Sequence, residues 1–138
     1  MTGAANDFVR ERIDGLPPEH KPFWEACARQ ELTAQRCDDC GRFRYPPAAQ
    51  CPNCLSENST WQRLSGRGQV YSWSVIHHEF TPAYPPPYNV AIIELDEGIR
   101  MPSNIIGCDN ADIRAGMPVE VSFDEVSDGT FLPRFRPA

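Results

Sequence analysis

Four cysteines in two close pairs constrain the fold of this chain more than any other feature. Cys37 and Cys40 form the first Cys-x-x-Cys pair, Cys51 and Cys54 form the second, and ten residues separate the pairs. Two residues between cysteines let both sulfurs of a pair reach one ion, and two pairs complete the tetrahedron that zinc prefers, with Zn–S distances of about 2.3 Å. The spacing therefore predicts a zinc ribbon held by all four cysteines.

The predicted zinc is structural, because four thiolates leave no coordination position for water or a substrate. Residues 37–54 contain too few apolar side chains to form a core, so the metal has to replace one. The alternative for either pair is a dithiol–disulfide redox site, which no strand–helix setting of the thioredoxin kind supports here. Gly41 suits the tight backbone after Cys40, whereas Leu55 follows Cys54, so we expect the second knuckle to be less regular.

Length and composition restrict the class of protein. A chain of 138 residues fits one ordinary domain or two small packed modules, and 14 prolines beside 9 glycines favour short strands over a helical bundle. No segment approaches the roughly 20 apolar residues of a membrane span, and residues 1–7 lack the regions of a signal peptide. We expect a soluble cytoplasmic protein without disulfides, in which Cys27 and Cys108 are buried free thiols.

The hydrophobic pattern changes from helical to alternating along the chain. Asn6 is expected to cap a short helix that Gly15 ends, and a firmer helix is expected from Pro22 to Leu32. From Trp61 onward the period is two, which predicts a small closed barrel of five short strands. These strands are expected at Val70 to Phe80, Val90 to Leu95, Ile99 to Ile106, Val119 to Phe123 and Phe131 to Phe135. The predicted division is a helical segment at 1–35, the zinc ribbon at 36–60 and the barrel at 61–138.

The sequence contains no self-sufficient catalytic apparatus that we can identify. Residues 66–68 resemble a phosphate loop only faintly, because no Gly-Lys-Ser/Thr follows. His77 and His78 are adjacent on a predicted strand and point to opposite faces, so they cannot act on one substrate atom together. The carboxylates of residues 94–97 belong to an expected hairpin turn. We therefore predict no catalytic residues.

A proline-rich segment, Thr81 to Asn89, is expected to project from the barrel as a stiff extended loop. The alternative is a mere spacer. Aromatic side chains on a backbone that is already ordered bind at a low entropic cost, which favours a docking surface. The predicted docking residues are Tyr84, Pro85, Pro86, Pro87 and Tyr88.

Five segments, taken together and in this order, resemble one known family. They are FWEA at 23–26, CDDCGRFRYPP at 37–47, CPNC at 51–54, SGRGQVYSW at 65–73 and PPYNVAIIELDEG at 86–98. The chain is similar to the acyl-CoA-associated proteins that combine N-terminal helices, a rubredoxin-like zinc ribbon and a five-stranded OB-fold barrel, long catalogued as domain of unknown function thirty-five. Leu55, where the family usually has glycine, is a departure.

The resemblance implies an accessory scaffold subunit that is not catalytic alone. Members of the family pair with thiolase-like, lipid-transfer-type acyl-CoA enzymes, including thiolases and the retro-aldolases of steroid side-chain degradation. Others are fused or bound to MaoC-type enoyl-CoA hydratases of the hot-dog fold. The resemblance therefore implies a hetero-oligomer in which the partner carries out the chemical step on an acyl-CoA.

Charge indicates where coenzyme A would bind. Residues 1–67 are balanced, whereas residues 68–138 carry four basic and ten acidic side chains, a balance of −6. The phosphates of coenzyme A should therefore favour Arg42, Arg44, Arg63 and Arg67, although a merely solvated basic face is equally consistent with the sequence. The acidic barrel disfavours the alternative of a nucleic-acid-binding OB-fold. A purely structural bridge between enzymes is a third possibility.

Overall fold

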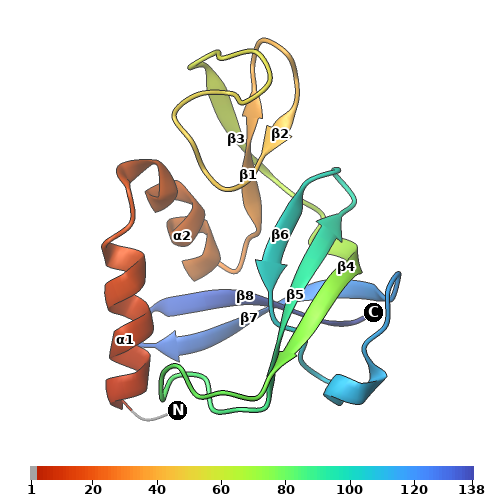
Figure 1. The fold of residues 1–138 in the computed structure, drawn as a ribbon. Coiled ribbons are helices and arrows are strands. Elements are labelled where there is room, and N and C mark those ends of the chain that lie inside the picture. Colours follow the sequence, from red (N-terminus) through yellow and green to blue (C-terminus); the bar gives the residue numbers. More distant parts are fainter. Residues whose placement is uncertain (1–2) are drawn as a thin grey trace.

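Figure 1 shows the computed structural model of the chain, which describes residues 3–138. Within these residues, helices and a small three-stranded sheet precede a curled five-stranded sheet. The helical elements are α1 (Gly3–Asp14), the 3₁₀ helix η1 (Pro18–His20), α2 (Lys21–Ala28) and the 3₁₀ helix η2 (Asn110–Asp112). The strands are β1 (Thr33–Cys37), β2 (Phe43–Arg44), β3 (Ser59–Arg63), β4 (Arg67–Ile76), β5 (Tyr88–Leu95), β6 (Arg100–Ser103), β7 (Pro118–Ser127) and β8 (Thr130–Pro137). The predicted class, mainly β with N-terminal helices, is confirmed.

The first helix differs from the prediction at its start. α1 begins at Gly3, so Asn6 lies inside the helix and is not its cap. The two alanines before Asn6 have the highest helix propensity, which extends the helix toward the N-terminus. The helix ends at Asp14, directly before Gly15, as predicted. No helix described between residues 3 and 138 is long and apolar enough to cross a membrane.

The second helix fixes the position of the ribbon against the barrel. Pro22 lies in the first turn of α2, and Phe23, Ala26 and Cys27 are buried along one face. The helix stops at Ala28, earlier than predicted, and Gln30 adopts a φ of 59° where the chain turns toward β1. β1 is the central strand of the three-stranded sheet, with antiparallel β2 and β3 on either side.

The five-stranded sheet has the order β6-β5-β4-β7-β8, with every neighbouring pair antiparallel. Its ends meet at one parallel bridge between Ile105 and Phe135. The N–H of Phe135 donates to the carbonyl of Asn104 at 3.0 Å, and the N–H of Ile106 donates to the carbonyl of Phe135 at 2.8 Å. The predicted barrel is therefore a strongly curled sheet, the half-barrel form of an OB-fold, closed along this short seam.

One apolar core joins the modules. Its buried members come from α2, from the start of β1 and from the inner face of the barrel, and Trp61 of β3 packs against them. The buried set is Phe23, Cys27, Leu32, Ala34, Leu64, Val70, Ala91, Ile93, Leu95, Met101, Ile105, Ile113, Val119 and Phe135. Helix, ribbon base and barrel therefore share buried surface.

The proline-rich loop does not project from the barrel, which corrects the prediction. Ala83 is buried with Val9 of α1 and Val126 of β7, and Tyr84 packs against the same cluster. The side chains of residues 83–84 pack against the outer face of the β7–β8 hairpin. The loop therefore lies against the protein. The division of the chain at residues 36 and 61 stays a prediction, with the three-stranded sheet extending from Thr33 to Arg63.

Candidate metal centre and its surroundings

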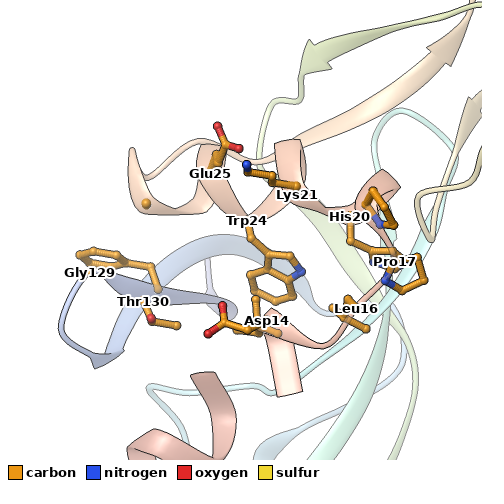
Figure 2. Close-up of a pocket in the computed structure, with 13 residues that line it drawn as sticks. Asp14, Leu16, Pro17, His20, Lys21, Trp24, Glu25, Gly129 and Thr130 are labelled. Carbon is orange, nitrogen blue, oxygen red and sulfur yellow. The ribbon is translucent and has the colours of Figure 1, made fainter. Parts of the chain in front are cut away.

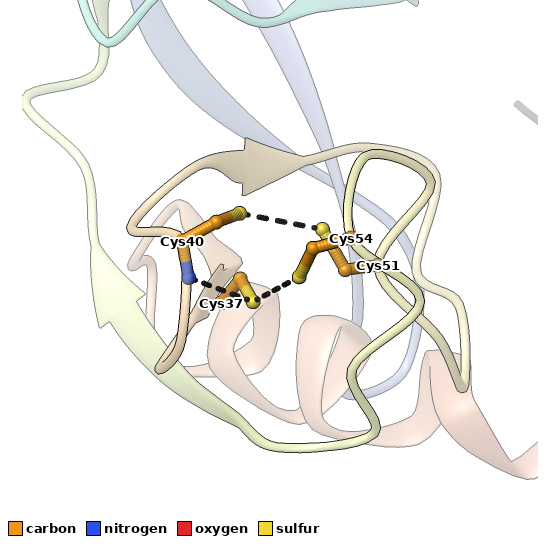
Figure 3. Close-up of side chains that lie close together, drawn as sticks. All are labelled: Cys37, Cys40, Cys51 and Cys54. Carbon is orange, nitrogen blue, oxygen red and sulfur yellow. Dashed lines mark hydrogen bonds between the residues drawn. The ribbon is translucent and has the colours of Figure 1, made fainter.

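The four predicted cysteine ligands converge in the three-stranded module. The sulfurs of Cys37 and Cys54 are 3.5 Å apart, those of Cys40 and Cys51 are 3.6 Å apart, and all four lie within 4.8 Å of one another (Figure 3). Four sulfurs at about 2.3 Å from one ion would be about 3.8 Å apart in a tetrahedron. The spacing of the sulfurs therefore fits a tetrahedral zinc ion.

Two similar backbone knuckles hold the sulfurs. The N–H of Gly41 donates to the carbonyl of Cys37 at 2.9 Å, and the N–H of Leu55 donates to the carbonyl of Cys51 at 2.8 Å. Gly41 has a φ of 78° and Leu55 a φ of 65°. The second knuckle thus repeats the first, contrary to our expectation of a less regular turn, and Leu55 adopts a left-handed conformation that costs an L-residue about 1–2 kcal/mol.

The knuckle backbone favours ionised sulfurs. Hydrogen bonds from backbone N–H groups lower the pKa of Cys37, Cys40 and Cys51. A backbone N–H also lowers the pKa of Cys54, but the Cys37 sulfur, burial and the other sulfurs outweigh it and raise the pKa to about 12. Four thiolates repel one another, so a bound cation is needed to keep all four ionised.

These residues fit a structural zinc ion. Cys37 and Cys51 are 2% and 1% exposed, while Cys40 and Cys54 lie at the surface of the module. Four sulfur ligands fill the coordination sphere and leave no place for a substrate. Zinc at this site is structural and stabilises the ribbon.

Polar contacts brace the knuckles from outside. The hydroxyl of Thr60 donates to a carboxylate oxygen of Asp38 at 2.8 Å, and the hydroxyl of Ser56 donates to Asp39. The N–H of Asp38 donates to the carbonyl of Asn58 at 3.0 Å. The first knuckle is therefore tied to the segment that follows the second, which holds the two cysteine pairs in register.

The structure separates the four predicted coenzyme A arginines. Arg44 is 5% exposed, and its guanidinium donates to the carbonyl of Ala48 at 3.0 Å and to the amide oxygen of Gln35 at 3.3 Å. Gln35 also accepts from the N–H of Ala48 at 2.8 Å. Arg44 is thus part of the interior of the ribbon, and we remove it from the predicted phosphate-binding set.

The other three predicted arginines are exposed and lie near the junction of ribbon and barrel. Arg42 lines a cleft of about 560 Å³ with Arg36 and Glu97. Arg63 ends β3 and Arg67 begins β4. Among residues 3–138, the structure records no ion pair for Arg42, Arg63 or Arg67. Their role in binding phosphates stays a prediction.

The predicted docking residues lie together at the edge of the barrel. The rings of Tyr84 and Tyr88 are 5.6 Å apart, and both line a pocket of about 340 Å³ with Arg134. Pro85 and Pro87 line the same pocket, and Pro86 is joined to Pro87 by a cis peptide bond. Burial raises the pKa of Tyr84. The docking role stays a prediction.

A further pocket escaped the sequence analysis. It measures about 490 Å³ and lies between α1, α2 and the turn that joins β7 to β8. Figure 2 shows the indole of Trp24 at its centre, with Leu16, Pro17 and Asp14 beside it. Its walls come from segments that are distant in sequence, so no local motif could have revealed it.

A buried amide, which we did not predict, lies at the start of β5. Asn89 is 5% exposed, and its side chain donates to the carbonyl of Ile105 at 2.8 Å and accepts from the N–H of Ile105 at 2.7 Å. Asn89 lies two residues before Ala91 and four before Ile93, so it points to the buried face of β5. A polar residue in the inward register of the predicted strand was the sequence signal for this buried amide.

Comparisons with known proteins match both modules. The family model described as ChsH2, rubredoxin-like zinc ribbon domain, matches residues 24–60, and the one described as ChsH2, C-terminal OB-fold domain, matches residues 61–124. A solved structure titled Ltp2-ChsH2(DUF35) aldolase superposes with a TM-score of 0.84 and 38% identity, covering 89% of this chain and 97% of that chain.

Curated relatives are described in three ways: as scaffold proteins, as thiolase subunits and as hydratase subunits. A DUF35 domain-containing scaffold protein of Methanocaldococcus jannaschii is 37% identical over 101 residues, which is 70% of each chain. The benzoylsuccinyl-CoA thiolase subunit BbsA of Thauera aromatica is 30% identical over 70% of this chain and 66% of its own length. A probable enoyl-CoA hydratase alpha subunit of Thermomonospora curvata is 43% identical over 84% of this chain. This chain spans only 37% of that hydratase subunit.

Proposed function

Because this chain belongs to the family of DUF35 domain-containing scaffold proteins, with the zinc ribbon and OB-fold of ChsH2, we propose that it is the accessory subunit of a thiolase-fold acyl-CoA enzyme. The partner carries the catalytic residues, and this chain positions the partner and its substrate. We place the complex in the cytoplasm, where cysteine thiols stay reduced and available to zinc.

One observation carries this proposal. The chain matches 97% of a chain in a solved aldolase assembly at 38% identity, so the likeness covers nearly all of that chain. The thiolase subunit among the relatives supports the same class of partner. The zinc site is closed, because its four sulfurs fill a tetrahedral coordination sphere.

Co-expression tests the proposed partner. The chain is produced with each thiolase-fold protein encoded in the same genome, and the mass of the purified species is measured by light scattering after gel filtration. We expect one stable hetero-oligomer, which cleaves a carbon–carbon bond of a 3-hydroxyacyl-CoA or transfers an acyl group. If this chain elutes alone beside every thiolase-fold protein, the proposal is wrong.

The second candidate is a subunit of an enoyl-CoA hydratase complex. The 43% identity to a hydratase alpha subunit favours it. The two candidates differ in the reaction of the purified complex, because a hydratase consumes the conjugated double bond of an enoyl-CoA and breaks no carbon–carbon bond. Hydration without cleavage would therefore select this second candidate.

Within the complex, Arg42, Arg63 and Arg67 bind the phosphates of the acyl-CoA. Their charge, their exposure and their position at the junction of the modules support this assignment. Glu97 shares the cleft with Arg42, but its carboxylate accepts a hydrogen bond from the N–H of Ser65 at 2.8 Å.

Charge reversal tests the phosphate site. Arg42→Glu should weaken the binding of acyl-CoA to the complex by about tenfold or more, because it replaces an attraction by a repulsion. Arg114→Glu is the matched control, since Arg114 is equally a surface arginine but lies in the barrel, and its affinity should not change. Equal affinities of the two variants, measured by titration calorimetry, would remove the phosphate site and leave the scaffold proposal standing.

A further inference from the structure

The second half of β4 has an unpaired edge. β4 pairs with β7 only through Arg67, Gly68 and Gln69, and Val70 then bonds through both its N–H and its C=O to the turn at residues 116–117. After a bulge at Tyr71, the strand pairs with β5 alone from Ser72 to Ile76. In an antiparallel strand, alternate residues direct their N–H and C=O groups to each side. Within the described part of the chain, the groups that point away from β5 here have no backbone partner.

Apart from the bulge at Tyr71, this edge lacks the features that protect other edges of the sheet. β6, on the other side of β5, carries Pro102 and Arg100, and the Arg100 guanidinium reaches across β5 to lie 3.8 Å from the ring centroid of Tyr71. β8 carries Pro133 and Pro137. Prolines and charged side chains discourage another strand from pairing with an edge. From Val70 to Ile76 the sequence VYSWSVI has no charge and no proline. The β4 edge is therefore open to an additional strand.

Large apolar side chains surround the open edge. Trp73 is 36% exposed although its cross-strand partner, Ala91, is fully buried, so the inner face of the sheet continues uncovered beyond the core. Val90, on the opposite face, is 39% exposed, and Phe80 in the following loop is 73% exposed. In contrast, Trp61 of β3 packs against the core. Such a group of exposed apolar side chains is typical of a protein interface.

The charge of the barrel argues against a second copy of this chain as the occupant. Residues 68–138 carry a balance of −6 from four basic and ten acidic side chains, so two barrels joined edge to edge would repel each other. The uncharged edge instead fits an uncharged or basic strand of a different protein. A row of unpaired backbone N–H and C=O groups is satisfied by another strand. A small ligand cannot bond to the whole row, so it does not fit as the occupant.

We propose that a β-strand of the thiolase-fold partner subunit adds to β4 along Tyr71–Ile76, with Trp73 and Phe80 as its apolar anchors. The inference rests on the proposed function, since it names the surface through which that partner binds. Figure 1 shows the zinc ribbon at one end of the barrel and the connection between β4 and β5 at the other, beside α1. The partner strand therefore binds at the end of the barrel that is opposite the zinc ion.

Matched lysine substitutions test the surface. Ser74 is exposed on β4, and Gln62 is exposed on β3, an edge strand of the ribbon. In the co-expressed complex, Ser74→Lys should raise the Kd for the partner by at least about tenfold, because the added strand would remove solvent from the charge of the new lysine. Gln62→Lys should change the Kd by less than about twofold. Trp73→Ser should weaken binding and Trp73→Phe should largely preserve it. Thermal unfolding of each variant alone verifies that the fold is retained.

Hydrogen exchange gives an independent measurement on the unsubstituted protein. Alternate amides of Tyr71–Ile76 should exchange fast in the isolated chain and slow by at least about tenfold in the complex. A complex that forms while these amides stay unprotected, with equal affinity for Ser74→Lys and Gln62→Lys, would overturn the inference and leave the proposed function intact. A homodimer of the isolated chain that Ser74→Lys dissociates would assign the edge to a second copy instead. Absence of any complex would defeat both proposals.

Discussion

The ribbon and the barrel maintain their folds by different means. In the ribbon, the side chains at the centre of the knuckles are the sulfurs of Cys37 and Cys51, and its buried polar groups, Arg44 and Gln35, bond to each other and to backbone. In the barrel, the buried side chains are apolar except that of Asn89, with Ile93 and Phe135 at 0% exposure. A segment without enough apolar surface can still fold if one ion supplies the missing free energy, whereas the barrel uses burial from many strands.

Removal of zinc should have the largest effect and should act on one region. A strong chelator, or Cys37→Ser, should unfold the ribbon, because zinc binding supplies on the order of 10–16 kcal/mol in comparable peptides. The barrel should keep its protected amides, which hydrogen exchange measures, while a colorimetric dye follows zinc release. Loss of barrel protection together with the metal would show that the two regions form one cooperative unit.

A cavity in the barrel should produce the opposite result. Phe135→Ala removes a fully buried ring at the seam and should lower the free energy of unfolding by about 3–5 kcal/mol in a denaturant titration. The zinc content should stay at one ion per chain. Phe80→Ala is the control, since Phe80 is 73% exposed, and should cost less than about 0.5 kcal/mol.

A substitution inside the ribbon sharpens the comparison further. Arg44→Met keeps most of the side-chain volume but leaves Gln35 and the carbonyl of Ala48 without their guanidinium partner, which should destabilise the ribbon by about 1–3 kcal/mol. The measurement is zinc release during chelator titration. Arg42→Met should release zinc at the same chelator concentration as the unsubstituted protein, because Arg42 is exposed. Identical behaviour of both variants would contradict a structural role for Arg44.

The smallest expected effect is a gain in stability. Leu55→Gly relieves the left-handed conformation at a φ of 65° and should stabilise the zinc-bound ribbon by about 1 kcal/mol. Leu55→Ala removes the exposed side chain but keeps the strain, so it should give no such gain. Equal stability of the two variants in chelator titrations would mean that the second knuckle relaxes around leucine without cost.

The zinc site could be predicted from sequence because all its ligands lie within residues 37–54, and a local spacing carries the whole geometry. The barrel strands were also predictable from alternation, although the clearest strand is β5, where Asn89, Ala91, Ile93 and Leu95 are all buried. Val121 and Phe123, two inward positions of the strand predicted at Val119 to Phe123, are only half-buried, whereas Val119 of the same strand is buried.

The surroundings of the site depend on contacts that no local pattern carries. Arg44 has the same side chain as Arg42, and only the position of Ala48 and Gln35 makes it interior. The proline-rich loop has the composition of an exposed segment, yet Ala83 is buried against Val9 and Val126, which come from the two ends of the chain. The burial of Arg44 and the packing of the proline-rich loop both depend on residues from distant segments.

The seam at Phe135 has a consequence for synthesis of the protein on the ribosome. β8 follows every other described strand in chain order, and the parallel bridge between Ile105 and Phe135 needs it. Cys37 to Cys54 leave the exit tunnel much earlier, and a ligand set so close in sequence closes only a short loop around its metal. The nascent chain can therefore acquire zinc while its barrel is still incomplete, so metal supply acts on folding before the seam can close.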